Sequence, residues 1–102
     1  RNIVVIADML ELGEKSPEIH FETGRYIAIE GIDVLITIGE NSRYLSDGAK
    51  SSNKDILIAH FTDNREACGF LNDHITIGDK ILIKGSRGMH TEEIANYLIN
   101  KI

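Results

Sequence analysis

The segment Lys84–Gly88 carries the side chains best suited to binding an anion. It contains two cations, one hydroxyl and two glycines, and it lies between a short apolar run and a helix start at Thr91. The planar guanidinium of Arg87 matches a carboxylate or a phosphate, the hydroxyl of Ser86 can donate a hydrogen bond, and glycine lets the backbone approach a ligand closely. We predict that this turn, including Lys84, faces an anion; the alternative is an ordinary loop with a solvated arginine.

Three further polar residues near the start of the chain could contribute to a site: Asp8, Glu11 and His20. Asp8 directly follows an apolar run and could accept hydrogen bonds from a ribose, face a cationic partner, or cap a helix or turn. Glu11 could hold a substrate amine, pair with a lysine, or be a solvated turn residue. His20 precedes Gly24 by one helical turn, and it could orient the loop at Asp8 or be an ordinary partly buried histidine.

Several known site patterns are absent from the sequence. No G-x-x-x-x-G-K-[ST] phosphate-binding loop occurs, and no G-x-G-x-x-G follows the first apolar run. His60, His74 and His90 lack the spacing of metal ligands, and no Ser-His-Asp or Cys-His set can be assembled. We therefore expect no metal site, no catalytic residue and no self-sufficient nucleotide site in this chain.

The elements that must position these residues follow from four short apolar runs, at 3–6, 34–38, 56–59 and 81–83. The runs are mostly β-branched and continuous, which is typical of strands covered on both faces. Helices are predicted between them, starting at Ser16 as N-cap, at 41–42 with an interruption at Asp47-Gly48, at the capping box that Asp63 opens, and at Thr91. This order predicts an α/β fold, a three-layer Rossmann-like domain whose mainly parallel sheet has helices on both faces. Ligands of such sheets bind beyond the carboxyl ends of the strands, where the candidate residues lie.

The composition is that of one globular domain over residues 1–102, with 42% hydrophobic and 26% charged residues. The net charge of −5 argues against a nucleic-acid partner, and no apolar run is long enough for membrane insertion. Cys68 is the only cysteine; it fits a reducing compartment and is expected to be a small packing residue in a helix. The chain enters its first strand without an initiating Met, so we expect it to be a piece of a longer protein.

Two motifs together resemble the C-terminal domain of the Mur ligases: residues 7–13 and residues 84–89. His20 with Gly24 and the run 32–39 lie between them, and the resemblance covers essentially the whole chain. Within this family, the motifs are most similar to the enzymes that add D-alanyl-D-alanine to UDP-N-acetylmuramoyl-tripeptide in peptidoglycan precursor synthesis. Ala7 is a departure, since glycine is expected at that position.

The resemblance implies a cytoplasmic, three-domain ATP-dependent amide ligase of which this chain is the third domain. ATP and Mg²⁺ would be bound mainly by the missing central domain, which this domain closes over, and the isolated domain would be inactive. UDP-N-acetylmuramoyl-tripeptide, D-alanyl-D-alanine and the other domains of the same chain would be its partners. Lys84, Ser86 and Arg87 would bind substrate. Asp8 would face the ATP side, with Glu11 and His20 shaping its loop.

A receiver-like phosphosignalling module is an alternative with a similar sheet, in which Asp8 and Lys84 would occupy the acidic and lysine positions. Its phosphoacceptor carboxylate should end a middle strand, and neither Ile38-Gly39 at the end of the second run nor His60-Phe61 after the third supplies it. A generic Rossmann-like small-molecule binding module is the other alternative. The sequence does not specify the strand order.

Overall fold

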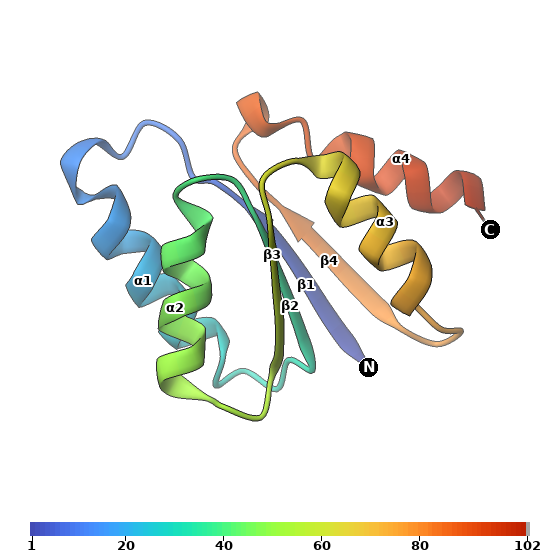
Figure 1. The fold of residues 1–102 in the computed structure, drawn as a ribbon, viewed down its shortest axis with the longest axis horizontal. Helices are drawn as coiled ribbons and strands as arrows, with labels where there is room; N and C mark the ends of the chain where they lie inside the picture. The colour runs from blue at the N-terminus through green and yellow to red at the C-terminus, as the bar shows by residue number, and fades with distance from the viewer. Residues whose placement is uncertain (102) are drawn as a thin grey trace.

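The computed structural model describes residues 1–101, and strands alternate with helices along the chain (Figure 1). The strands are β1 (Asn2–Ala7), β2 (Val34–Ile38), β3 (Leu57–Phe61) and β4 (Lys80–Lys84). The helices are α1 (Ser16–Ile27), α2 (Ser42–Ser52), α3 (Asn64–His74) and α4 (Glu92–Lys101), and the short 3₁₀ helices are η1 (Gly13–Lys15) and η2 (Arg87–Met89). No helix in this part of the chain has both the length and the apolar character needed to cross a membrane.

The described strands form one parallel sheet in the order β3-β2-β1-β4. In its centre, Val5 of β1 lies opposite Ile36 of β2 on one side and Ile83 of β4 on the other. Figure 1 shows α1 and α2 on one face of the sheet and α3 and α4 on the other. The predicted three-layer α/β architecture with a parallel sheet is therefore confirmed.

Each face of the sheet has its own apolar core, and β1 contributes to both. Val4 and Ile6 pack toward α1 and α2, whereas Ile3, Val5 and Ala7 pack toward α3 and α4. Because β1 and β2 are buried on both sides, their sequences are apolar at almost every position. The expectation of full coverage was wrong for β3 and β4, which form the two edges of the sheet and are only partly buried.

Two glycines allow α1 and α2 to pack backbone against backbone. A Cβ atom at Gly24 would overlap the carbonyl group of Leu45, and one at Gly48 would overlap that of Phe21. Gly48 is the residue at which the sequence suggested an interruption of α2. That suggestion was wrong, because α2 continues from Ser42 to Ser52 and uses the missing side chain for a close approach to α1.

The helix starts agree with the sequence at α3 but differ at α1. The Asp63 carboxylate accepts a hydrogen bond from the Glu66 N–H at 2.9 Å, as the capping box predicted. At α1, Lys15 occupies the N-cap position and Ser16 is already helical, because η1 leads directly into the helix. Cys68 is buried in α3, as expected of a packing residue, and burial raises the pKa of its thiol.

Candidate ligand-binding face

The loops that follow the strands lie together along one edge of the sheet, because all four strands are parallel. These loops comprise residues 8–12, 39–41, 62–63 and 85–91, and Figure 1 shows them along the upper edge of the molecule. We call this edge the loop face. It is where open parallel sheets bind ligands. Its loops contain four of the six residues singled out in the sequence, and Lys84, the last residue of β4, lies directly beside them.

The side chain of Asp8, the first residue after β1, points into the protein. Its side chain is buried, and its two oxygens accept hydrogen bonds from the backbone N–H groups of Ser42 at 2.7 Å and Asn41 at 3.2 Å. A carboxylate in this position caps the N-terminus of α2 and is favoured by the helix dipole. Gly39 makes room for it, since a Cβ there would lie 2.5 Å from an Asp8 oxygen. The geometry favours the capping role, and a contact between Asp8 and ATP stays a prediction.

His20 connects α1 to the loop after β1 and is fully buried. Its Nδ1 lies 2.7 Å from the Ser16 carbonyl oxygen, which places the ring proton on Nδ1 because a carbonyl can only accept. Nε2 is then free to accept a hydrogen bond from the Met9 N–H at 3.0 Å. The imidazole therefore fixes the loop after β1, called the first loop below, at Met9.

Ser86, in the loop after β4, fixes the same loop. The Leu10 N–H donates to its hydroxyl oxygen at 2.8 Å, and the Ser86 N–H donates to the carbonyl oxygen of Asp8 at 3.3 Å. The loops after β1 and β4 are consequently joined by two hydrogen bonds that involve one residue.

Asn64 ties the loop after β4 to the start of α3, and the sequence did not identify it. Its side-chain amide donates to the carbonyl oxygens of Met89 at 2.9 Å and His90 at 3.2 Å. His90 has a left-handed backbone with φ of 53°, and Glu11 in the first loop has φ of 65°. Each of the two candidate loops therefore holds one non-glycine residue in a sparsely populated conformation, which is a feature of functional sites.

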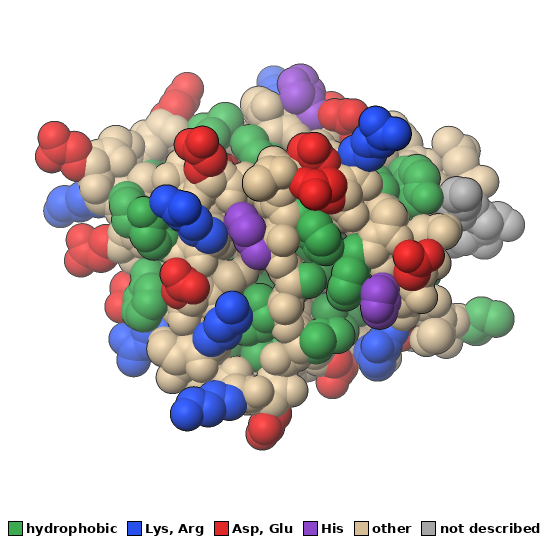
Figure 2. Space-filling view, in the orientation of Figure 1, with side chains coloured by type: hydrophobic (Ala, Val, Ile, Leu, Met, Phe, Trp, Pro, Cys, Tyr) green, Lys and Arg blue, Asp and Glu red, His purple; other side chains and the backbone are tan. Residues whose placement is uncertain are grey.

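Lys84, Arg87 and Glu11 remain exposed on the loop face. Within residues 1–101, their side chains take part in no hydrogen bond or ion pair, so their charges are free to meet a ligand. On the side of the molecule in Figure 2, lysine and arginine side chains are interspersed with acidic ones.

Carboxylates of the chain itself occupy the helix N-termini at this face. Asp8 caps α2, Asp63 caps α3, and Glu92 and Glu93 lie in the first turn of α4. A helix N-terminus binds phosphate only if its N–H groups are available. In the described residues, no group of three or more His, Cys, Asp or Glu side chains could hold a metal ion. The loop face can therefore attract an anion through Lys84 and Arg87, but it offers no phosphate cradle.

An internal polar chain links the edge strand β3 to α2. Thr37, fully buried in β2, bonds to Ser46 of α2 and to the Nδ1 atom of His60 in β3, the latter at 2.7 Å. Burial lowers the pKa of His60, opposed in part by the charge of Asp8. The signal in the sequence was Thr37, the one polar residue in the run 34–38. The chain fastens α2 to the sheet, and the Thr37 hydroxyl at its centre is buried away from any substrate.

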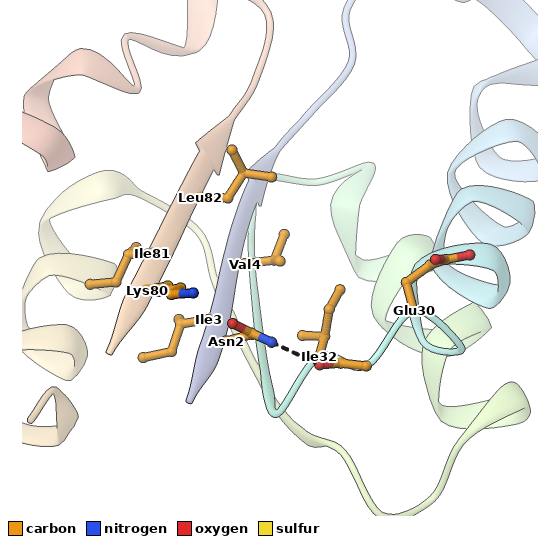
Figure 3. A pocket seen from close by; sticks show the side chains of 9 residues that line it. Asn2, Ile3, Val4, Glu30, Ile32, Lys80, Ile81 and Leu82 are labelled. Atoms are coloured by element: carbon orange, nitrogen blue, oxygen red, sulfur yellow. Dashed lines mark hydrogen bonds between the residues drawn. The ribbon is translucent and has the colours of Figure 1, made fainter. Parts of the chain in front are cut away.

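A groove runs along β1 and β4 on the α1 side of the sheet. Figure 3 shows Val4, Ile32 and Leu82 around a cavity of about 350 Å³ at the end of the strands opposite the loop face. A second cavity of about 550 Å³ lies against the same three residues and extends to Lys84 and Ser86. The groove is open because α1 and α2 leave β4 uncovered, so that Leu82 is 54% exposed. It is apolar because Val4, Ile32 and Leu82 line it.

Comparisons with known proteins identify the family. Residues 1–87 match the family described as Mur ligase, glutamate ligase domain. The chain belongs to the Mur ligase family. The UDP-N-acetylmuramoyl-tripeptide–D-alanyl-D-alanine ligase of Bacillus subtilis is 33% identical over 99 residues, which cover 97% of this chain and 22% of that protein. The chain thus spans only about a fifth of the relative's length.

Solved structures of Mur ligases share the fold. A crystal structure of MurF from Acinetobacter baumannii has a TM-score of 0.85 and 27% identity, and the match covers 97% of this chain and 22% of that one. MurF from Thermotoga maritima, solved in complex with ADP, has a TM-score of 0.71 at 23% identity, covering 95% of this chain and 21% of that one. Mur ligases are ATP-dependent amide ligases. Family membership excludes the receiver-like alternative. Asp8 does follow a middle strand, β1, but its carboxylate is buried and caps α2, so it is not exposed as a phosphoacceptor must be.

Proposed function

We propose that residues 1–102 form the C-terminal domain of a cytoplasmic three-domain ligase that joins D-alanyl-D-alanine to UDP-N-acetylmuramoyl-tripeptide. The product of this reaction is a peptidoglycan precursor. An amide bond forms between the amine of the dipeptide and the terminal carboxyl group of the tripeptide, and ATP is converted to ADP and phosphate. The relative from Bacillus subtilis, whose name describes this reaction, supports the proposal at 33% identity.

ATP and Mg²⁺ do not fit a site made by this domain alone. The helix N-termini at the loop face are capped by carboxylates, and the described residues contain no cluster of metal ligands. We therefore place the phosphates and the metal mainly on the central domain of the parent ligase. The domain described here contributes by closing over that site, where it positions the substrates and excludes water.

The observation that carries the proposal is the pair of free cations, Lys84 at the end of β4 and Arg87 in the loop after it. Hydrogen bonds fix this loop to its neighbours. The dipeptide carries a reactive amine at one end and a single carboxylate at the other. Arg87 can bind that carboxylate with two parallel hydrogen bonds, which also sets the direction in which the amine points. Lys84 adds a second positive charge to the same surface.

The test is the substitution Arg87→Ala in the full-length ligase, with ADP release measured at varied D-alanyl-D-alanine. A charge-assisted hydrogen bond contributes about 1.5–3 kcal/mol, so kcat/KM for the dipeptide should fall by roughly 10- to 150-fold. Arg25→Ala is the matched control, because Arg25 is an exposed arginine of α1 whose ion pair with Glu22 lies outside the loop face. The proposal for Arg87 fails if both variants retain the wild-type kcat/KM with the fold intact.

A further inference from the structure

Ser86 occupies the point at which the sheet ends and the turn carrying Arg87 begins. The last paired residues of β1 and β4 are Ile6 and Lys84. Beyond this pair, Ser86 still contacts two residues of the neighbouring chain segment, Asp8 through its N–H and Leu10 through its hydroxyl. A residue within a parallel ladder makes such a pair of contacts with its own N–H and carbonyl groups.

The hydroxyl of Ser86 takes the place that its carbonyl group would have in a continuing ladder. The carbonyl is thereby free to turn away, and it accepts the Met89 N–H at 2.9 Å. This bond closes the 3₁₀ turn η2, which begins at Arg87. One side chain thus lets the backbone remain attached to the first loop while it starts the turn that presents the arginine.

The contact at Leu10 also completes the restraint of the first loop. The Met9 N–H is held by His20 from α1, and the next N–H, that of Leu10, is held by Ser86. The following residue, Glu11, is in the left-handed region with φ of 65°. Such a conformation persists when its surroundings determine it, and the two consecutive restraints provide this.

We propose that Ser86 is a positioning residue that acts through Arg87, rather than the substrate contact expected from the sequence. This inference rests on the proposed function of the loop face. The hydroxyl oxygen is already engaged by the Leu10 N–H. Ser86 fixes the position of Arg87 relative to the first loop, and the carboxylate is bound by Arg87.

The kinetic test is a double-mutant cycle in the full-length ligase with kcat/KM for D-alanyl-D-alanine as the readout. Loss of one neutral hydrogen bond corresponds to a fall of about five- to tenfold for Ser86→Ala in the wild-type background. In the Arg87→Ala background the same change should have less than a twofold effect, because the residue it positions is gone. Ser86→Thr keeps the hydroxyl and should restore activity. Ser52→Ala is the control, because Ser52 lies at the C-terminus of α2, away from the loop face. An equal fall in both backgrounds, or no fall in either, overturns the inference.

A second readout does not depend on the substrate. Hydrogen exchange of the full-length ligase should show one additional fast amide in the peptide that spans residues 8–13 for Ser86→Ala, and none for Ser86→Thr. Unchanged exchange in Ser86→Ala would overturn the positioning role. If the wild-type enzyme shows no turnover that depends on the dipeptide while this exchange difference is present, the proposed function fails and the structural link through Ser86 stands.

Discussion

The packing of α1 against α2 gives a prediction about Gly24 whose sign is opposite to that expected from helix propensity. Replacing a glycine by alanine inside a helix normally stabilises the helix by about 0.5–1 kcal/mol. At Gly24 the added Cβ would overlap the carbonyl oxygen of Leu45 and lie 2.8 Å from its carbonyl carbon and 3.0 Å from the Ala49 nitrogen. These are backbone atoms of α2, so no side-chain rotation can relieve the overlap.

The expected magnitude follows from the separation that the two helices must gain. Ordinary van der Waals contact requires about 3.4 Å or more, so α1 must move away from α2 along much of their contact. Overpacking of this kind typically costs 1–3 kcal/mol and occasionally more, which outweighs the gain in helix propensity. We predict a net loss of roughly 2 kcal/mol for Gly24→Ala, a large part of the ~5–15 kcal/mol typical of a domain.

Gly69→Ala is the matched control, because Gly69 is an exposed glycine inside α3 and a Cβ there meets no atom within 4 Å. We expect this variant to be more stable than the wild type by about 0.5–1 kcal/mol. Urea unfolding followed by far-ultraviolet circular dichroism measures both changes. If Gly24→Ala is as stable as the wild type, or if the two substitutions change stability in the same direction, the predicted clash between α1 and α2 is wrong.

Two further stability predictions follow from polar contacts. Ser42→Ala should leave the free energy of unfolding unchanged or raise it by up to about 1 kcal/mol, because the buried Ser42 hydroxyl has no partner in the described residues. Ser46→Ala should lower the free energy of unfolding by about 1 kcal/mol, because the hydrogen bond to Thr37 is lost. Equal effects of the two substitutions in urea unfolding would contradict this prediction. The pKa of Asp79 lies well below its usual value, chiefly because of its hydrogen bonds from Arg1 and then from the Thr76 N–H. Its stabilisation should therefore be complete above pH ~4 and be lost as the pH falls toward the lowered folded pKa, so that wild type and Asp79→Asn converge in acid. A difference in urea midpoint that persists unchanged from pH 6 to pH 2 would show this assignment to be wrong.

The strands could be predicted from the sequence because their signal is local. The run 34–38 coincides with β2, and the other apolar runs lie within a residue or two of β1, β3 and β4. The third run was ended too early, at Ala59, because His60 is polar; an edge strand tolerates such a residue, and β3 continues to Phe61.

The orientation of the site residues could not be predicted, because it depends on contacts between distant parts of the chain. Asp8 caps α2 only because β2 lies beside β1, and the sequence carried no information on strand order. The contact of Ser86 with Leu10 joins residues 76 positions apart. The types of residue at the strand ends could be identified in advance, whereas the distinction between a cap, a link between loops and a free cation required the fold.

The proposed ligase reaction is tested by ADP release from the full-length ligase with ATP, Mg²⁺ and UDP-N-acetylmuramoyl-tripeptide, in the presence and absence of D-alanyl-D-alanine. We expect sustained ADP release only when the dipeptide is present, with formation of the pentapeptide precursor, and none from residues 1–102 alone. ADP release that is independent of D-alanyl-D-alanine, or that a single amino acid supports in place of the dipeptide, would contradict the proposed function.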